Sequence, residues 1–232
     1  MILINDVIRI ATEEVGYLEK ATNAYLDDKF ANAGAGNWTK YARDLWDAIP
    51  QFFQGNKNGH DWCTIFFAWL IYKASGLKSD EAQKALYYTG PYGAGCTYAV
   101  RYYKAANAWY TTPQPGDQVF FGSGTSVKHT GLVTKVDSLH IYTIEGNAEN
   151  AVRQRMYNLT DPRIIGYGRP KYDGVGDDFP FVDVPNGSWY YDAARWCYSH
   201  GIVAGTDEEH LSPLRATSRA EVMQMLYKAL GE

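Results

Sequence analysis

The chain reads Gly59-His60-Asp61-Trp62-Cys63-Thr64-Ile65-Phe66-Phe67-Ala68-Trp69-Leu70-Ile71-Tyr72 where a glycine turn leads through a cysteine into an almost wholly apolar run. Apolar residues recur along this run with the spacing of one helical face, and large aromatic and aliphatic residues fill the opposite face. A helix of this kind needs cover on every side. We therefore predict a buried helix that begins near Cys63 and ends near Ser75, with the rest of the fold built around it.

The cysteine at the start of this helix is a candidate nucleophile. Asp61 is a residue type that often caps helices, which would place Cys63 in the first turn. There the free backbone N–H groups and the helix dipole favour an anion, and a thiolate is the nucleophilic form of cysteine. The alternative is that Cys63 is simply a small buried apolar residue, because free cysteines are among the most buried residue types.

The composition indicates a globular protein of one large domain, or of one domain and a small module, within 232 residues. Hydrophobic residues make up 46% of the chain, aromatic residues 15% and charged residues 21%, which argues against disorder. The formal net charge is −4 and no basic block occurs, so nucleic acid is not an expected partner. Aromatic-rich clefts favour carbohydrate or peptide-like ligands instead.

The cysteine spacing and the chain's N-terminal stretch exclude further classes. Cys63, Cys96 and Cys197 match neither a disulfide framework nor a CxxC zinc site. Calcium-loop spacing and His-Glu-x-x-His are also missing, so we expect no metal and no cofactor. The first residues lack the basic start and apolar core of a signal peptide, and no run is suited to cross a membrane. We expect synthesis in the cytoplasm without a signal peptide, and no membrane insertion.

A hairpin in the second half of the chain is expected to bring three polar residues together. From about residue 116 the pattern changes to short β-branched and aromatic runs between turns, which predicts an antiparallel sheet. If Val136 pairs with His140, then His129 pairs with Asn147. Glu145 shares a face with Asn147, because strand side chains alternate. His129, Glu145 and Asn147 would then converge, and a shift of one residue would separate them.

These residues have the chemistry that a cysteine nucleophile requires. His129 is the candidate base, since an imidazole titrates near the working pH. Glu145 or Asn147 would hold its second ring nitrogen and so fix its tautomer. The backbone N–H of Cys63 would contribute to an oxyanion hole. Cys96, after a second glycine-rich stretch, is the rival nucleophile, although we expect it to pack in the core or line the cleft.

Five motifs occur in an order that resembles a CHAP domain. They are Asp61-Trp62-Cys63 before the apolar helix, Gly116-Asp117-Gln118-Val119-Phe120-Phe121, His129-Thr130-Gly131-Leu132-Val133, Thr143-Ile144-Glu145-Gly146-Asn147 and Ile165-Gly166-Tyr167-Gly168-Arg169-Pro170. CHAP domains are cysteine, histidine-dependent amidohydrolases or peptidases that cleave peptidoglycan. The resemblance covers residues 1–172, and the segment 14–20 is also similar to phage endolysins of this group.

The resemblance implies a fold and a set of site residues. The expected fold class is α+β, papain-like (NlpC/P60-like), with an antiparallel sheet packed on a central N-terminal helix. The implied roles are Cys63 as nucleophile, His129 as base, and Glu145 with Asn147 as orienting residues. Some members of the family bind calcium through aspartates before the cysteine, whereas Asp61 stands alone here, so we again expect no metal.

A second module is expected after a polar linker at residues 173–180. Two amphipathic stripes in residues 181–232 predict a small all-α unit, the first helix capped by Ser188. Ser218 and Glu221 form a capping box for the second helix. The expected inner faces are Trp189, Ala193, Trp196, Cys197 and His200 in the first helix, and Val222, Met225, Leu226 and Ala229 in the second.

This module resembles a single S-layer homology (SLH) repeat. The motifs are Phe181-Val182-Asp183-Val184-Pro185, Gly201-Ile202-Val203-Ala204-Gly205-Thr206 and Thr217-Ser218-Arg219-Ala220-Glu221. Such repeats bind secondary cell-wall polysaccharide, usually as three copies together. The resemblance implies that the ligand is bound by Arg219, with Trp189, Gly205 and Thr206 as further candidates. Arg219 as a solvated residue at a helix start is an equal alternative.

Together these features predict an endolysin-like peptidoglycan hydrolase that acts on the bacterial cell wall after holin release or another route of exit. It would be an N-acetylmuramoyl-L-alanine amidase or a peptide-stem or cross-bridge endopeptidase, held on the wall by the SLH module. The isolated module is small, so we expect oligomerisation through it, for instance as a trimer, or docking on the enzyme domain. The alternatives are an inactive wall-binding protein on the same scaffold and a glycosidase that uses Glu13 or Glu14.

Overall fold

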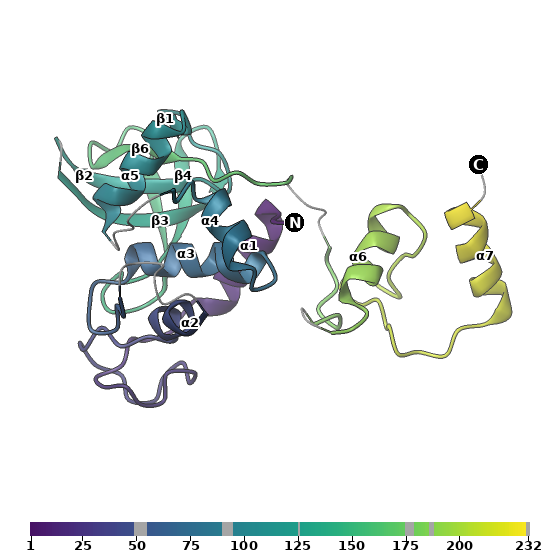
Figure 1. The fold of residues 1–232 in the computed structure, drawn as a ribbon. Helices are drawn as coiled ribbons and strands as arrows, with labels where there is room; N and C mark the ends of the chain where they lie inside the picture. Colours follow the sequence, from purple (N-terminus) through teal and green to yellow (C-terminus); the bar gives the residue numbers. More distant parts are fainter. Residues whose placement is uncertain (49–54, 90–94, 125, 175–178, 186–187, 231–232) are drawn as a thin grey trace. The chain divides into compact units, whose positions relative to one another are not determined.

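The computed structural model covers residues 1–232 and describes all of them except 49–54, 90–94, 125, 175–178, 186–187 and 231–232. The chain divides into two units, Met1–Val175 and Gly176–Glu232, which we describe separately (Figure 1). None of the described helices is long and apolar enough to cross a membrane.

The predicted central helix is α3 (Cys63–Ala74), and every residue from Cys63 to Tyr72 is buried. The other helices of the first unit are α1 (Ile4–Glu14), α2 (Lys40–Ala48), α4 (Ser79–Ala85) and α5 (Cys96–Ala105). Helices α1, α2 and α4 pack on α3, which also contacts strands of the sheet (Figure 1). The helix is therefore covered by other elements on all sides, as an apolar surface of this extent requires.

The sheet has six strands in the order β1-β6-β2-β3-β4-β5, and every neighbouring pair is antiparallel. The strands are β1 (Trp109–Tyr110), β2 (Gln118–Ser123), β3 (Ser126–Val136), β4 (His140–Glu145), β5 (Arg153–Asn158) and β6 (Ile164–Gly168). An antiparallel sheet packed on a central helix confirms the predicted α+β fold class.

The register of the β3–β4 hairpin differs from the prediction at the turn and agrees with it near the site. Asp137 accepts hydrogen bonds from the backbone of Leu139 and His140 and closes a turn with a two-residue loop, so Val136 pairs with Ile141 and not with His140. The pairing then shifts by one residue between Val133 and Lys135, as at a β-bulge. Beyond this shift the pairs Leu132↔Ile144 and Val133↔Thr143 follow the predicted register.

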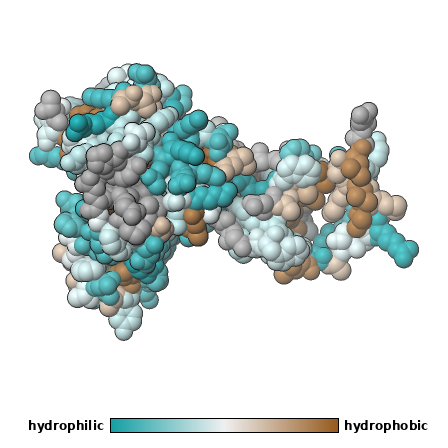
Figure 2. Space-filling view, in the orientation of Figure 1, coloured by the Kyte–Doolittle hydropathy of each residue, from teal (hydrophilic) through white to brown (hydrophobic). Residues whose placement is uncertain are grey.

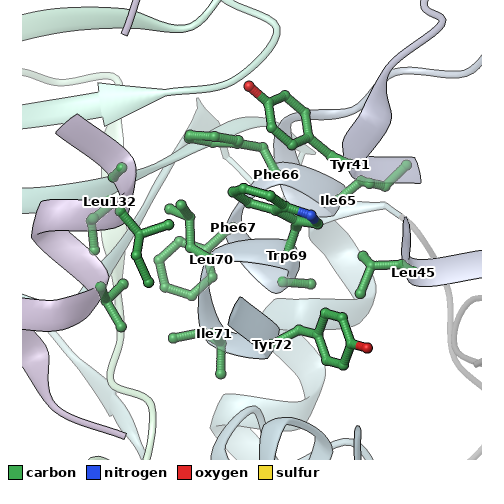
Figure 3. Close-up of a cluster of buried hydrophobic side chains, with 14 of the residues drawn as sticks. Tyr41, Leu45, Ile65, Phe66, Phe67, Trp69, Leu70, Ile71, Tyr72 and Leu132 are labelled. Atoms are coloured by element: carbon green, nitrogen blue, oxygen red, sulfur yellow. The ribbon is translucent and has the colours of Figure 1, made fainter. Parts of the chain in front are cut away.

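The core of the first unit is aromatic and centred on α3 (Figure 3). Tyr41 of α2 lies with its ring centroid 4.9 Å from both Phe66 and Trp69. Each large apolar side chain that is fully buried in this way contributes about 1.5–3 kcal/mol to stability. Trp62, at the start of α3, also carries a polar group into the core, where its Nε1 donates to Oε2 of Glu19 at 2.7 Å. This bond ties the segment before α2 to the start of α3.

The second unit contains α6 (Tyr191–Ser199) and α7 (Arg219–Leu230). Its small core is formed by Phe181, Val184 and Tyr191. The predicted capping box is confirmed, because Ser218 N donates to Oε2 of Glu221 at 2.7 Å and Glu221 N donates to Oγ of Ser218 at 3.2 Å.

The predicted inner faces of this unit are wrong. Ser188 does not cap the first helix, whose N-cap is Tyr190. Trp189 is 90% exposed and precedes the helix, and Trp196 is also exposed. Helix α7 has no buried residue, so its apolar side chains lie on the surface, where Figure 2 shows them as hydrophobic residues along the helix. The described residues of the second unit leave most of both stripes uncovered.

Candidate active site

Cys63 is the first residue of α3 and lies in the first turn, as predicted, with a residual exposure of 7%. The predicted cap is wrong. The N-cap is Trp62 and no side chain caps the helix, because the Trp62 ring is held in the core by Glu19 while Asp61 stays exposed. The backbone N–H of Cys63 is consequently one of the free donors at the helix start. Such a donor is suited to bind a developing oxyanion.

His129 projects from β3 and pairs with a carboxylate of the neighbouring strand. Its Nε2 lies 2.9 Å from Oε2 of Glu145, and because a carboxylate only accepts, Nε2 carries the proton. The ring also stacks on Phe121, with centroids 5.9 Å apart. Hydrogen bonding between His129 and the Cys63 thiol then uses the second ring nitrogen, Nδ1. The imidazole therefore lies between the thiol and the carboxylate.

Glu145 is 1% exposed and is held by more than the imidazole. Oγ1 of Thr143 donates to its Oε1 at 2.6 Å. The Tyr157 hydroxyl of β5 is a further hydrogen-bonding partner, and burial together with the Glu145 charge raises the pKa of Tyr157. Sequence reasoning did not single out Thr143 or Tyr157. Alternation along β4 places Thr143 on the face of Glu145, but only the pairing of β4 with β5 brings Tyr157 there.

The predicted pairing of Asn147 with His129 is not among the pairs of strands β3 and β4. Strand β4 ends at Glu145, and the chain then turns, with Asn147 at a φ of 59°. Its Nδ2 donates to Oδ1 of Asp61 at 3.2 Å. Glu145 is thus the residue that fixes the tautomer of His129 in this structure. Asn147 instead connects the end of β4 to the segment just before Cys63.

The rival nucleophile lies against the first one. Cys96 is the first residue of α5, and its Sγ is 3.6 Å from Sγ of Cys63 and 3.2 Å from Oγ1 of Thr64. Cys96 is 6% exposed, and neither it nor Cys63 is in a disulfide. The sequence suggested a packing or cleft role for Cys96. It contained no signal that the two thiols would meet, because their contact depends on the non-local approach of two helix ends.

The hydrogen bond between the sulfurs couples their ionisation. This bond and burial raise the pKa of the Cys63 thiol well above its usual value, although His129 acts in the opposite direction. Hydrogen bonds from Cys63 and Thr64 outweigh burial and lower the pKa of Cys96. Burial would lower the pKa of His129, but hydrogen bonds with Cys63 and Glu145 outweigh it and raise the pKa to about 9. The raised pKa of His129 favours the imidazolium form at neutral pH.

The two acidic residues of the glycosidase alternative lie elsewhere in the fold. The Glu14 carboxylate is buried and accepts bonds of 2.8 Å from both Lys40 Nζ and the Tyr41 hydroxyl. Glu13 is exposed and pairs with Arg9 at 2.7 Å. Both side chains have structural partners, and neither is part of the group around Cys63. Among the described residues, no three or more His, Cys, Asp or Glu side chains are grouped as ligands for a metal ion.

Two family models match the chain. Residues 55–147 match the CHAP domain, and residues 180–223 match the S-layer homology domain. The protein therefore carries a CHAP domain followed by an S-layer homology domain. This arrangement agrees with the resemblance drawn from the motifs.

Two solved structures are similar to this chain at 15% sequence identity. "The crystal structure of Ly7917" has a TM-score of 0.41 and matches 75% of this chain and 63% of its own. "The crystal structure of Ly7917 with the hydrolyzing product of MDP" has a TM-score of 0.40, with 72% and 62% matched. The match thus spans less than two thirds of the length of Ly7917. No curated protein matches the chain.

Proposed function

We propose that this protein is a peptidoglycan hydrolase that cleaves an amide bond by a thiol mechanism. The observation that carries the proposal is the placement of the His129 imidazole between the Cys63 thiol and the buried Glu145 carboxylate. A nucleophile, a base and a residue that orients the base are the three parts that such chemistry needs. The CHAP match over residues 55–147 supports peptidoglycan as the substrate.

The mechanism begins with a proton that has to leave Cys63. The His129 imidazole accepts it, because the hydrogen bond and charge interaction with Cys63 help to raise the His129 pKa to about 9 and so favour the imidazolium at neutral pH. The resulting Cys63 thiolate, paired with imidazolium, attacks the amide carbonyl. The N–H of Cys63 stabilises the oxyanion, and His129 gives its proton to the departing amine.

Release of the acyl-enzyme reverses the role of His129. Acylation consumes the Cys63 thiol, which is one of the groups that raise the His129 pKa. The pKa of His129 therefore falls, and the neutral imidazole can take a proton from the attacking water. Glu145 holds Nε2–H throughout, so Nδ1 stays directed at the reacting atoms. One residue can thus act first as acid and then as base.

The bond that is cut is either the N-acetylmuramoyl-L-alanine amide or a peptide bond of the stem or cross-bridge. The test is digestion of purified peptidoglycan by the full chain and by Cys63→Ala, followed by mass spectrometry of the fragments. New amino groups with the original protein and none with Cys63→Ala are expected. Unchanged lysis with Cys63→Ala contradicts a thiol mechanism, and absence of lysis with both favours the inactive scaffold. New reducing ends without new amino groups would select a glycosidase.

We propose that the second unit holds the enzyme on the wall by binding secondary cell-wall polysaccharide. Trp189 is almost fully exposed, and Arg219 begins the exposed helix α7, so both are available to a saccharide ligand. Two other predicted binding residues have structural reasons for their positions. A Cβ at Gly205 would lie 2.2 Å from the Asp207 carbonyl oxygen. The Thr206 hydroxyl is hydrogen bonded to Ser212 at 2.8 Å. Arg219 and Trp189 are therefore the stronger candidates.

Self-association through α7 is the second part of this proposal. The helix has no buried residue, although it carries several large apolar side chains. The exposed ones are Val222, Met223, Leu226, Tyr227 and Leu230. A surface of this kind is stabilised by a partner, and several copies of the repeat brought together would supply one. Binding to the polysaccharide would then gain from several sites that act together.

A further inference from the structure

The two buried thiols of the first unit form a pair that hydrolysis does not explain completely. Their sulfurs are 3.6 Å apart, within van der Waals contact, although the residues are 33 positions apart in the sequence. The proton of Cys63 is taken up by His129, so hydrolysis requires no second acceptor beside the Cys63 sulfur. The residue found there is instead another cysteine, and it begins a helix that packs on the same strand, β3, as α3 does.

We propose that Cys63 and Cys96 are the site of a reversible oxidative modification, in which a hydroperoxide converts the two thiols into a disulfide and thereby removes the nucleophile. Formation of the disulfide does not depend on which bond the enzyme cleaves. Only the loss of wall lysis rests on the proposed function. The oxidant is small enough to reach sulfurs that are 6–7% exposed, whereas a bulky disulfide oxidant would not fit as readily.

Cys96 is the cysteine that reacts first. Its pKa is lowered while that of Cys63 is raised, so Cys96 carries the larger thiolate fraction. Its thiolate attacks one peroxide oxygen, so that an S–O bond forms, the O–O bond breaks and the released hydroxide becomes water on protonation. The product is a sulfenic acid at Cys96.

Cys63 resolves this intermediate. Its sulfur attacks the sulfur of the Cys96 sulfenic acid, the S–S bond forms and the S–O bond breaks. The departing hydroxide takes the Cys63 proton and leaves as water. In total, two thiols and one hydrogen peroxide give one disulfide and two waters. Two equivalents of thiol, or one of a dithiol, reverse the modification.

The geometry requires only a small movement. A disulfide has an S–S distance of about 2.05 Å, so the sulfurs must approach by about 1.5 Å from their present 3.6 Å. Both cysteines are the first residues of their helices, where the side chain is not enclosed by a preceding helical turn. The third cysteine, Cys197, belongs to the second unit and is half-buried. It therefore serves as an internal control.

The test uses the full chain treated with a small excess of hydrogen peroxide, then catalase, then N-ethylmaleimide. Non-reducing peptide mapping should show the Cys63 and Cys96 peptides linked, with the mass lowered by two hydrogens, while Cys197 is alkylated. Wall lysis should fall in proportion to the linked fraction and return with dithiothreitol. Cys197→Ser should behave as the original chain does. In Cys96→Ala, peroxide should also reduce wall lysis, but dithiothreitol should restore much less of it than in the original chain.

Three results would overturn the proposal. The first is alkylation of both Cys63 and Cys96 after peroxide. The second is a sulfinic acid at Cys63 without any linked peptide. The third is a linked protein that lyses the wall as fast as the reduced one. If neither state lyses the wall, the proposed function fails, but the linked peptide still decides whether the thiol pair is oxidised. The two failures are therefore distinguishable.

Discussion

Nε2 of His129 and Oε2 of Glu145 lie 2.9 Å apart, and the carboxylate is almost completely buried while the imidazole remains partly open to solvent. Because Glu145 is buried, water does not compete with it as the hydrogen-bond acceptor for Nε2 of His129. The charge of Glu145 is therefore coupled directly to the protonation of His129. Several expected outcomes depend on this pair and on the thiols next to it.

The variant Glu145→Gln tests the charge while keeping the shape. Glu145 is one of the groups that raise the His129 pKa, so its neutralisation should lower that pKa. The alkaline limb of the lysis rate should move to lower pH, and kcat/KM should fall by about 10²–10⁴-fold, as when the orienting carboxylate of a catalytic histidine is lost. A pH–rate profile on purified peptidoglycan measures both effects. If the alkaline limb stays at the same pH, Glu145 does not affect the protonation of His129.

The same raised pKa predicts how stability depends on pH. A histidine with a pKa of about 9 in the folded protein and 6.5 when unfolded contributes stability that is fully present below about pH 6.5. This contribution is lost as the pH rises through about 9. Thermal unfolding from pH 6 to 10 should therefore show an alkaline fall in Tm that is smaller in His129→Ala. Equal slopes for the two proteins would contradict the assignment.

Removal of Cys96 should make Cys63 more acidic. The hydrogen bond with Cys96 is the largest cause that raises the Cys63 pKa, and Cys96→Ala abolishes it. The pH at which Cys63 reacts half-maximally with iodoacetamide should shift downward. Cys197→Ser, in the second unit, is the matched control and should leave that pH unchanged. An unchanged or higher value in Cys96→Ala would mean that the sulfurs do not interact in solution.

Thr143→Val separates positioning from packing. Valine preserves the β-branched shape, but the hydrogen bond of 2.6 Å to Oε1 of Glu145 is lost. A buried hydrogen bond to a charged group contributes about 1.5–3 kcal/mol, so urea denaturation should show a loss of that order. The pH–rate profile should also shift, because Glu145 is held less firmly. Lower stability with an unaltered profile would reduce Thr143 to a structural residue.

Leu226→Asp tests self-association through α7. Leu226 is exposed on a helix without buried residues, and a carboxylate there should oppose apolar contact between copies. Light scattering after gel filtration should find an oligomer for the original chain and a monomer for this variant. Gln224→Asp adds the same charge at an exposed polar position of α7 and should leave the oligomer intact. A monomeric original chain would remove the basis of the proposal.

Local patterns predicted the central helix and most of the sheet, but not β1 (Trp109–Tyr110) or β5 (Arg153–Asn158). The apolar run after Cys63 predicted the buried helix, and the alternation in residues 116–168 predicted the antiparallel sheet. The sequence predicted correctly that His129 and Glu145 meet, although the predicted register of the β3–β4 hairpin was wrong at the turn. The shift at Val133 compensates for the shorter loop, so that the site end of the hairpin follows the predicted pairing. A pattern of alternation alone contains no information on such a compensation.

Features that depend on distant residues could not be predicted. The Asp61 cap failed because the bond from Trp62 to Glu19, 43 residues away, decides which residue enters the core. The contact of Cys63 with Cys96 depends on how two helix ends meet. The apolar residues of α7 were predicted to form an inner face, but a sequence pattern does not state whether the same chain supplies the cover, and α7 has no buried residue.

The bond between Trp62 and Glu19 has a consequence for protein engineering. The CHAP match begins at residue 55, yet Glu19, α1 and α2 all precede it, and Tyr157 follows its end at residue 147. A chimeric protein that contained only residues 55–147 would lack Glu19, the acceptor for the indole N–H of Trp62. It would also lack α1 and α2, which cover two sides of α3. The segment to transfer is the whole first unit, because Trp62, next to the proposed nucleophile Cys63, is held by a residue outside the matched stretch.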